Sequence, residues 1–165
     1  MPQGGIYPSY FGLRVPSLTS GASNFPILEL QTGATDYVVL HELECMHCDT
    51  GVAGNFITFG LGIPAARGVG RNPTYFSFDS GSDKVPQLAA YTDWSTQPTV
   101  PTAYHRRFNM NILDTTLMTQ RPMLFRFPRG LKIAPSSSIV LWEIAIGTNI
   151  ANTVAIMITS IVADG

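Results

Sequence analysis

Two long apolar runs near the end of the chain constrain the fold more than any other feature. They span Ile139–Ile146 and Val154–Val162 and are separated by residues 147–152, which include a glycine, a threonine and two asparagines. Apolar and β-branched runs of this length, bounded by turn-forming residues, are typical of buried strands. Neither run approaches the roughly 20 apolar residues that a membrane-spanning helix needs. We therefore predict that the two runs form a hairpin of strands at the centre of a pair of sheets.

Other segments also have the pattern of strands. The stretch Phe125–Ile133 predicts a strand, a turn at its Pro-Arg-Gly centre and a second strand. In Asn55–Ile63 two glycines, Gly60 and Gly62, indicate a bulge or a close neighbour. No apolar repeat with helical spacing extends beyond two turns. Further strands are predicted at Ile27–Leu30, Tyr37–Met46, Thr74–Phe78, Leu88–Tyr91 and Tyr104–Leu113.

The predicted fold class is all-β. We expect a two-sheet antiparallel sandwich, jelly-roll-like, with about eight to ten strands and an extended N-terminal arm. The 165 residues suffice for one domain. Residues 1–26 hold four prolines that forbid a helix, so we interpret them as an interaction arm. Residues 27–165 form the sandwich, in which 64–101 is a long irregular loop region, either functional or ordered by a partner.

The composition favours a chain with extensive interfaces. Charged residues make up 13% and apolar residues 45% of the chain, and the net charge is −1. Lysine occurs twice, at Lys84 and Lys132, against eight arginines. Because interfaces are depleted in lysine, this balance predicts an oligomer, although a neutral soluble domain is the alternative. The chain has no basic block, so we expect no nucleic-acid partner.

The N-terminal sequence lacks the features of a targeting signal. Residues 1–5 contain neither a basic region nor an apolar region, so we expect no secretory signal peptide. No apolar stretch is long enough for a transmembrane helix, and we expect no membrane partner.

The densest group of potential metal ligands is His41–Asp49. It contains Cys45 and Cys48 in a C-x-x-C pattern, with His41 and His47 beside them. A structural zinc site needs four converging ligands and usually a second pair elsewhere, which this chain lacks. The simplest interpretation is that Cys45 is a small core residue and Cys48 ends a strand, and we expect no bound metal.

A disulfide within this pair is disfavoured by geometry. Residues three apart on a strand have Cα atoms about 10 Å apart, beyond the roughly 7 Å that a disulfide tolerates. It would form only if the chain turned at Met46–His47. The remaining alternative is an intermolecular disulfide through Cys45 or Cys48.

Signals for catalysis or cofactor binding are weak. Gly60-x-Gly62 and Gly68-x-Gly70 are not followed by the Gly-Lys-Ser/Thr of a phosphate loop, so turn glycines explain them better. The acidic stretch Asp79–Asp83 lacks the final glutamate of a calcium loop. No Gly-x-Ser-x-Gly elbow is present. We expect no enzyme activity, no catalytic residue and no cofactor.

Aromatic and aliphatic side chains on irregular segments are candidates for contacts with a partner. Aromatic side chains give large rigid contact area at low entropic cost, although they can equally pack a loop onto its own domain. The candidates on the arm are Ile6, Tyr7, Tyr10, Phe11 and Leu13, and those in the middle region are Tyr75, Phe76 and Trp94.

Several segments of the chain, taken together, resemble the organisation of a known class of proteins. They are Tyr37–Leu43, Gly60–Pro64, Pro128–Ile133 leading into Ile139–Glu143, and the final apolar strand. In this organisation the chain resembles head decoration (cement) proteins of tailed bacteriophages and related jelly-roll virion proteins. The resemblance implies a compact, lysine-poor, often trimeric protein that clamps neighbouring capsid subunits, commonly through an extended arm. It transfers no functional residue.

The function expected from these observations is a non-enzymatic capsid decoration protein on the virion surface. It would be a homotrimer that contacts the major capsid protein or neighbouring virion subunits, made in the host cytoplasm. One alternative is a carbohydrate- or receptor-binding jelly-roll module, such as a fibre tip or lectin-like domain. A further alternative is a filament subunit that adds its N-terminal strand to the sheet of its neighbour.

Overall fold

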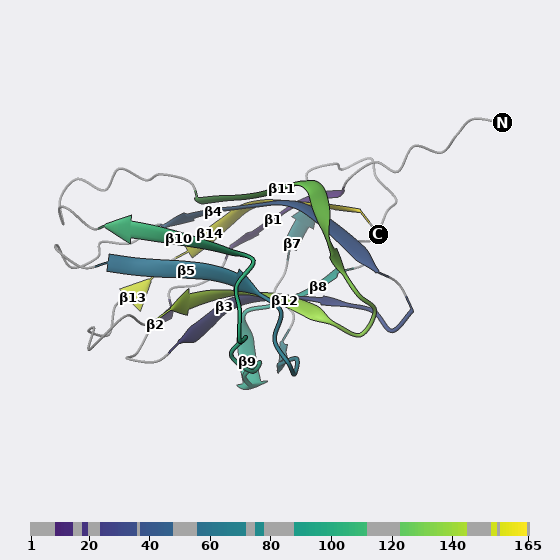
Figure 1. Ribbon diagram of the computed structural model, residues 1–165, viewed down its shortest axis with the longest axis horizontal. Helices are drawn as coiled ribbons and strands as arrows, with labels where there is room; N and C mark the ends of the chain where they lie inside the picture. Colours follow the sequence, from purple (N-terminus) through teal and green to yellow (C-terminus); the bar gives the residue numbers. More distant parts are fainter. Residues whose placement is uncertain are drawn as a thin grey trace.

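Every described secondary-structure element of the computed structural model is a β-strand (Figure 1). The structure describes residues 9–14, 18–19, 24–35, 37–47, 56–71, 75–77, 88–111, 123–144, 153–154 and 156–164. These strands form two five-stranded antiparallel sheets and two two-stranded ribbons. The arrangement is sandwich-like, as the sequence predicted at this level.

The two large sheets are named here by their central strands. The β14 sheet has the order β11 (Met123–Ile133), β4 (Val38–His47), β14 (Ile156–Asp164), β1 (Ser9–Arg14) and β7 (Tyr75–Ser77). The β12 sheet has the order β10 (Arg106–Asn111), β5 (Phe56–Gly62), β12 (Ser138–Ile144), β3 (Phe25–Thr32) and β8 (Leu88–Tyr91). The ribbons pair β2 (Leu18–Thr19) with β13 (Thr153–Val154), and β6 (Val69–Arg71) with β9 (Asp93–Thr96).

The main strands pair in a nested order. Along the chain they are β1, β3, β4, β5, β10, β11, β12 and β14. The first pairs with the last, the second with the seventh, the third with the sixth and the fourth with the fifth. Successive nested pairs alternate between the two sheets, and β4·β14 and β5·β12 contacts join them side by side. The eight strands therefore pair as the two arms of one long antiparallel hairpin, and successive pairs along this hairpin lie alternately in the two sheets.

The predicted C-terminal hairpin is wrong, although the central position of both strands is correct. β12 and β14 belong to different sheets, and each is the middle strand of its five. The reason is that β12 is buried at five successive residues, Ser138–Trp142, so both of its faces must be covered. Placing the two apolar strands in separate sheets gives each of them a neighbour on both sides.

The predicted strand–turn–strand at Phe125–Ile133 is also corrected. Residues 123–133 form one strand, β11, that pairs with β4 on both sides of an irregularity between Arg126 and Leu131. Gly130 has a φ of 70°, a value that favours glycine, and it bends the strand without reversing it (Figure 1). The Pro-Arg-Gly segment is therefore a bulge.

The N-terminal and middle regions contribute strands to the sheets. Within the predicted arm, β1 lies between β14 and β7, and β3 begins at Phe25. The middle region contains the predicted strands near residues 75 and 88, which become the edge strands β7 and β8. It also contains the β6·β9 ribbon, which the sequence did not predict.

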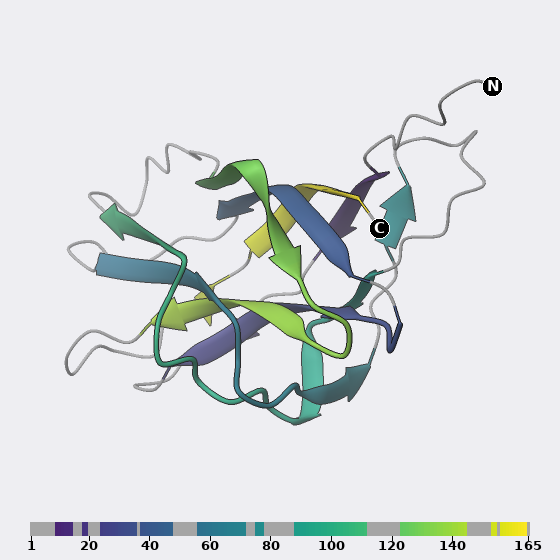
Figure 2. The same ribbon diagram turned by 45° about the vertical axis from the view of Figure 1, so that its right-hand side comes forward.

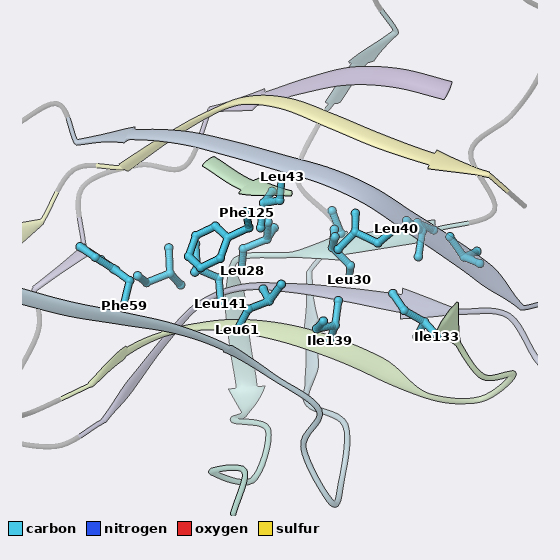
Figure 3. Close-up of a cluster of buried hydrophobic side chains, with 14 residues drawn as sticks. Leu28, Leu30, Leu40, Leu43, Phe59, Leu61, Phe125, Ile133, Ile139 and Leu141 are labelled. Atoms are coloured by element: carbon cyan, nitrogen blue, oxygen red, sulfur yellow. The ribbon is translucent and has the colours of Figure 1, made fainter. Parts of the chain in front are cut away.

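The core lies between the two sheets (Figure 3). The β14 sheet contributes Leu40, Leu43, Phe125 and Ile133, each fully buried. Facing them, the β12 sheet contributes the fully buried side chains of Leu28, Leu30, Phe59, Leu61, Ile139 and Leu141.

The opposite face of the β12 sheet is covered by two chain segments, residues 63–71 and 93–104, which we call the cover. Gly60 and Gly62 make this covering possible. A Cβ at Gly60 would lie 2.6 Å from the Tyr104 ring, and one at Gly62 would lie 2.7 Å from the Pro101 ring. The prediction that these glycines mark a close neighbour is confirmed.

Replacing Leu141 with alanine tests the importance of the central strand. Leu141 is 1% exposed and lies opposite Leu28 on one side and Leu61 on the other. We expect the free energy of unfolding to fall by about 2–5 kcal/mol, because the truncation leaves a cavity in the core. Urea denaturation measures this loss. Val100→Ala is the control, since Val100 is 48% exposed, and a change comparable to that of L141A would contradict the assignment.

Candidate interaction surface

A buried carboxylate fixes the cover to the β12 sheet. Glu29 of β3 is 0% exposed. Its oxygens accept hydrogen bonds from the Gly68 backbone N–H at 3.1 Å, from Trp94 Nε1 at 3.0 Å and from the Ser138 hydroxyl at 2.6 Å. A buried carboxylate is stable only when such donors replace water. Glu29 therefore joins both segments of the cover to two central strands.

Glycine at position 68 is required by this contact. A Cβ there would lie 2.7 Å from Glu29 Oε2 and would also meet the indole ring of Trp94. From the sequence, Gly68 and Gly70 are expected to be turn glycines. The structure shows that close packing is the stronger reason at Gly68. A second set of bonds holds the two cover segments together, with Ala66 and Thr99 exchanging backbone and side-chain hydrogen bonds.

The variant Glu29→Gln tests the role of this carboxylate. An amide would keep only one of the two acceptor oxygens, so Gly68, Trp94 and Ser138 could not all donate to the side chain as they do now. We expect the free energy of unfolding to fall by about 1–3 kcal/mol, the cost of unsatisfied buried polar groups. Urea denaturation followed by tryptophan fluorescence measures the effect. Glu42→Gln is the control, because its pair with Arg126 is exposed and contributes less than about 1 kcal/mol. Equal losses in the two variants would contradict the role of Glu29.

One edge of the sandwich gathers half of the chain's eight arginines. β10 and β11 are edge strands of opposite sheets, and they meet where the Phe108 and Phe125 rings pack edge to face, 5.7 Å between centroids. β10 carries Arg106 and Arg107, and β11 carries Arg126 and Arg129; all four side chains are exposed. We call these four residues the arginine edge.

Aromatic rings and one carboxylate orient these side chains. The Arg106 guanidinium lies 5.8 Å from the centroid of Phe127, and that of Arg107 lies 4.9 Å from the centroid of Tyr104. Arg126 Nε lies 2.9 Å from Glu42 Oε2. A guanidinium stacked on a ring keeps its N–H donors at the rim, where they can bind carboxylates. The arrangement suits the binding of an acidic surface.

Burial raises the pKa of the Tyr104 hydroxyl, and the nearby Arg107 charge partly opposes this shift. The Tyr104 oxygen and Trp142 Nε1 are both buried without a hydrogen-bond partner in the described part of the chain. The contacts of this side chain are therefore made by its ring, which covers Gly60 and stacks against the Arg107 guanidinium.

Replacing Tyr104 with phenylalanine separates the ring from its hydroxyl. We expect the variant to be as stable as the wild type or more stable by up to about 1 kcal/mol, because it removes a buried polar group that lacks a partner. The raised pKa favours the neutral phenol in the folded state, so wild-type stability should decline as the pH rises above about 10, the unfolded-state value. Urea denaturation at neutral and alkaline pH measures both effects. A marked loss of stability in the variant at neutral pH would contradict this account.

The structure brings together two of the predicted groups of contact residues. Tyr10, Phe11 and Leu13 lie in β1, directly beside Tyr75 and Phe76 of the edge strand β7. β1 pairs inside its own chain, with β14 and β7.

The other predicted contact residues are apart from this group. Trp94 lies in β9, and its indole N–H donates to Glu29. Cys45 lies in β4, opposite Met123 and Ile158. Ile6, Tyr7 and Cys48 are outside the described residues. Contacts of all these residues with a partner remain predictions.

Sequence reasoning missed both Glu29 and the arginine edge. The Arg106-Arg107 pair and the Arg126-x-x-Arg129 spacing were visible, but the sequence does not tell which strands become neighbouring edges. In the described ranges, no three His, Cys, Asp or Glu side chains are grouped so that they could hold a metal ion.

Comparison of the chain with protein-family models, with curated proteins and with solved structures finds no match. Within the part that the structure describes, no helix is long and apolar enough to cross a membrane.

Proposed function

We propose that the protein is a non-enzymatic structural protein of a virus particle, with a jelly-roll fold, that decorates and stabilises a capsid. The observation that carries the proposal is the nested pairing of its eight main strands, first with last and fourth with fifth. This winding supports the proposal of an eight-stranded jelly roll, an architecture common in viral capsid domains and also found in lectins. Because fold alone does not fix function, surface properties must decide between these uses.

The surface favours association with other proteins. Only 13% of the residues are charged. Large apolar side chains are exposed on the cover at Ile63, Val69 and Val100. The arginine edge adds cations that are oriented for carboxylates, and arginine is enriched at protein interfaces whereas lysine is depleted. These features support association with an acidic face of a neighbouring capsid subunit, and in this proposal the protein binds there as a homotrimer.

Such a protein would act by adding buried area across subunit boundaries. Opening the shell would then require breaking its contacts as well as those between the capsid subunits. In this proposal β1 completes the β14 sheet, and the preceding residues 1–8, with Ile6 and Tyr7, reach the neighbouring subunit.

Deletion of residues 1–8 tests the arm without removing β1, which begins at Ser9. We expect the wild type and the variant both to have a mass in solution of three times the 17.9 kDa of one chain, measured by light scattering. We expect only the wild type to co-sediment with shells of the capsid protein, because the variant lacks its arm. A monomeric wild type, or unchanged co-sedimentation of the variant, would contradict the proposal.

Reductant and salt provide the controls for this experiment. A mass that falls on reduction would assign Cys45 or Cys48 to the subunit interface. Binding through the arginine edge should weaken at high salt, since exposed charges are screened beyond about 3 Å at 1 M ionic strength.

A further inference from the structure

A polar depression of about 440 Å³ opens between the cover and the exposed end of the β12 sheet. It is lined by Gln31 of β3, Tyr91 of β8 and residues Arg67, Gly68, Val69 and Gly70 of the cover. It is separate from the arginine edge, because β8 and β10 are opposite edges of the β12 sheet.

The walls of the depression are held in place by hydrogen bonds. Gln31 Nε2 donates to the Gly68 carbonyl at 2.9 Å, and Arg67 Nη1 donates to the Thr32 carbonyl at 3.2 Å. Tyr91 lies opposite Glu29 in the β3–β8 pairing, and Gln31 follows two residues after Glu29, on the same face of the sheet. The Gly68 N–H is in turn fixed by the Glu29 carboxylate. Hydrogen bonds therefore connect the walls of the depression to the sheet and to the Glu29 carboxylate.

The depression presents one cationic side chain to solvent. Arg67 is the only charged residue among those that line it. The nearby carboxylate of Glu29 is buried and accepts hydrogen bonds from three donors. The bond to Thr32 uses one of the five N–H donors of Arg67, so its guanidinium can still bind a carboxylate through two parallel hydrogen bonds.

We propose that this depression binds a sugar that carries a carboxylate, such as a uronic acid or a sialic acid at the end of a glycan. Arg67 would bind the carboxylate. The Gln31 amide and the Tyr91 hydroxyl would bind ring hydroxyls, and the Tyr91 ring would pack against the apolar face of the sugar. The volume lies within the range of small-molecule sites, about 300–1,000 Å³. A free phosphate would leave most of this space unfilled and would make no use of Tyr91.

This site is independent of the structural role proposed above. It needs only the folded chain, and a monomer or a trimer could carry it. Failure of the capsid proposal therefore leaves this inference standing, and the reverse also holds.

Ligand titrations followed by NMR or calorimetry test the site. The probes are methyl glucuronide, sialyllactose, lactose and inorganic phosphate, added to the full chain. We expect the two acidic sugars, or one of them, to bind more tightly than lactose and phosphate. Arg67→Gln should weaken that binding about tenfold or more, since a lost charge-assisted contact costs that much. Arg67→Lys should recover only part of it, because lysine cannot make the bidentate contact.

Lys132→Gln is the control, because it removes an exposed positive charge in β11, in the other sheet and outside the arginine edge, and should leave sugar binding unchanged. Tyr91→Phe should retain the packing contribution, and Tyr91→Ala should lose it. Circular dichroism of each variant verifies that the sandwich is folded. Binding of lactose as tight as that of the acidic sugars, equal effects of R67Q and K132Q, phosphate binding as strong as sugar binding, or no binding of any probe would overturn the proposal.

Discussion

The requirement that the β12 sheet be covered on both faces governs the rest of this structure. Its central strand is buried at every residue from Ser138 to Trp142. One face packs on the β14 sheet through an aliphatic and aromatic core. The other face lies under the cover, and Gly60 and Gly62 allow the chain segments of the cover to approach it closely. The molecule is thus a two-sheet sandwich with an additional partial layer, which Figure 2 shows below the β12 sheet.

When irregular chain covers a sheet, polar groups of that chain lose their hydrogen bonds to water. In this protein a buried carboxylate provides replacement hydrogen bonds. Glu29 accepts hydrogen bonds from a backbone amide, an indole and a hydroxyl that come from three different segments. A carboxylate offers about four acceptor sites on two oxygens, whereas a glutamine amide offers only the two lone pairs of one oxygen. Glu29 therefore fixes the cover to the sheet and also positions Gly68, which lines the depression.

The sequence predicted local structure better than global structure. Alternating and continuous apolar patterns located most strands, because they depend on neighbouring residues alone. The assignment of β12 and β14 to different sheets depends on pairing with β5 and β4, far away in the chain, and a hairpin was the simpler prediction. The bulge in β11 was mistaken for a turn because Pro-Arg-Gly suits both. The sequence did not indicate that Glu29 is a buried hydrogen-bond acceptor, because the groups that donate to it lie about 40, 65 and 110 residues further along the chain.

The arginine edge illustrates how one feature can serve two physical purposes. Edge strands expose unpaired backbone groups and invite uncontrolled pairing, and charged side chains are a common protection against it. At this edge four arginines outnumber the one carboxylate, Glu42, that pairs with Arg126, and two of the guanidinium groups are stacked on the aromatic rings of Tyr104 and Phe127. Stacking lowers the entropy that a flexible arginine would lose on binding. An edge that repels copies of itself can therefore still accept an acidic partner, and this difference is a source of selectivity.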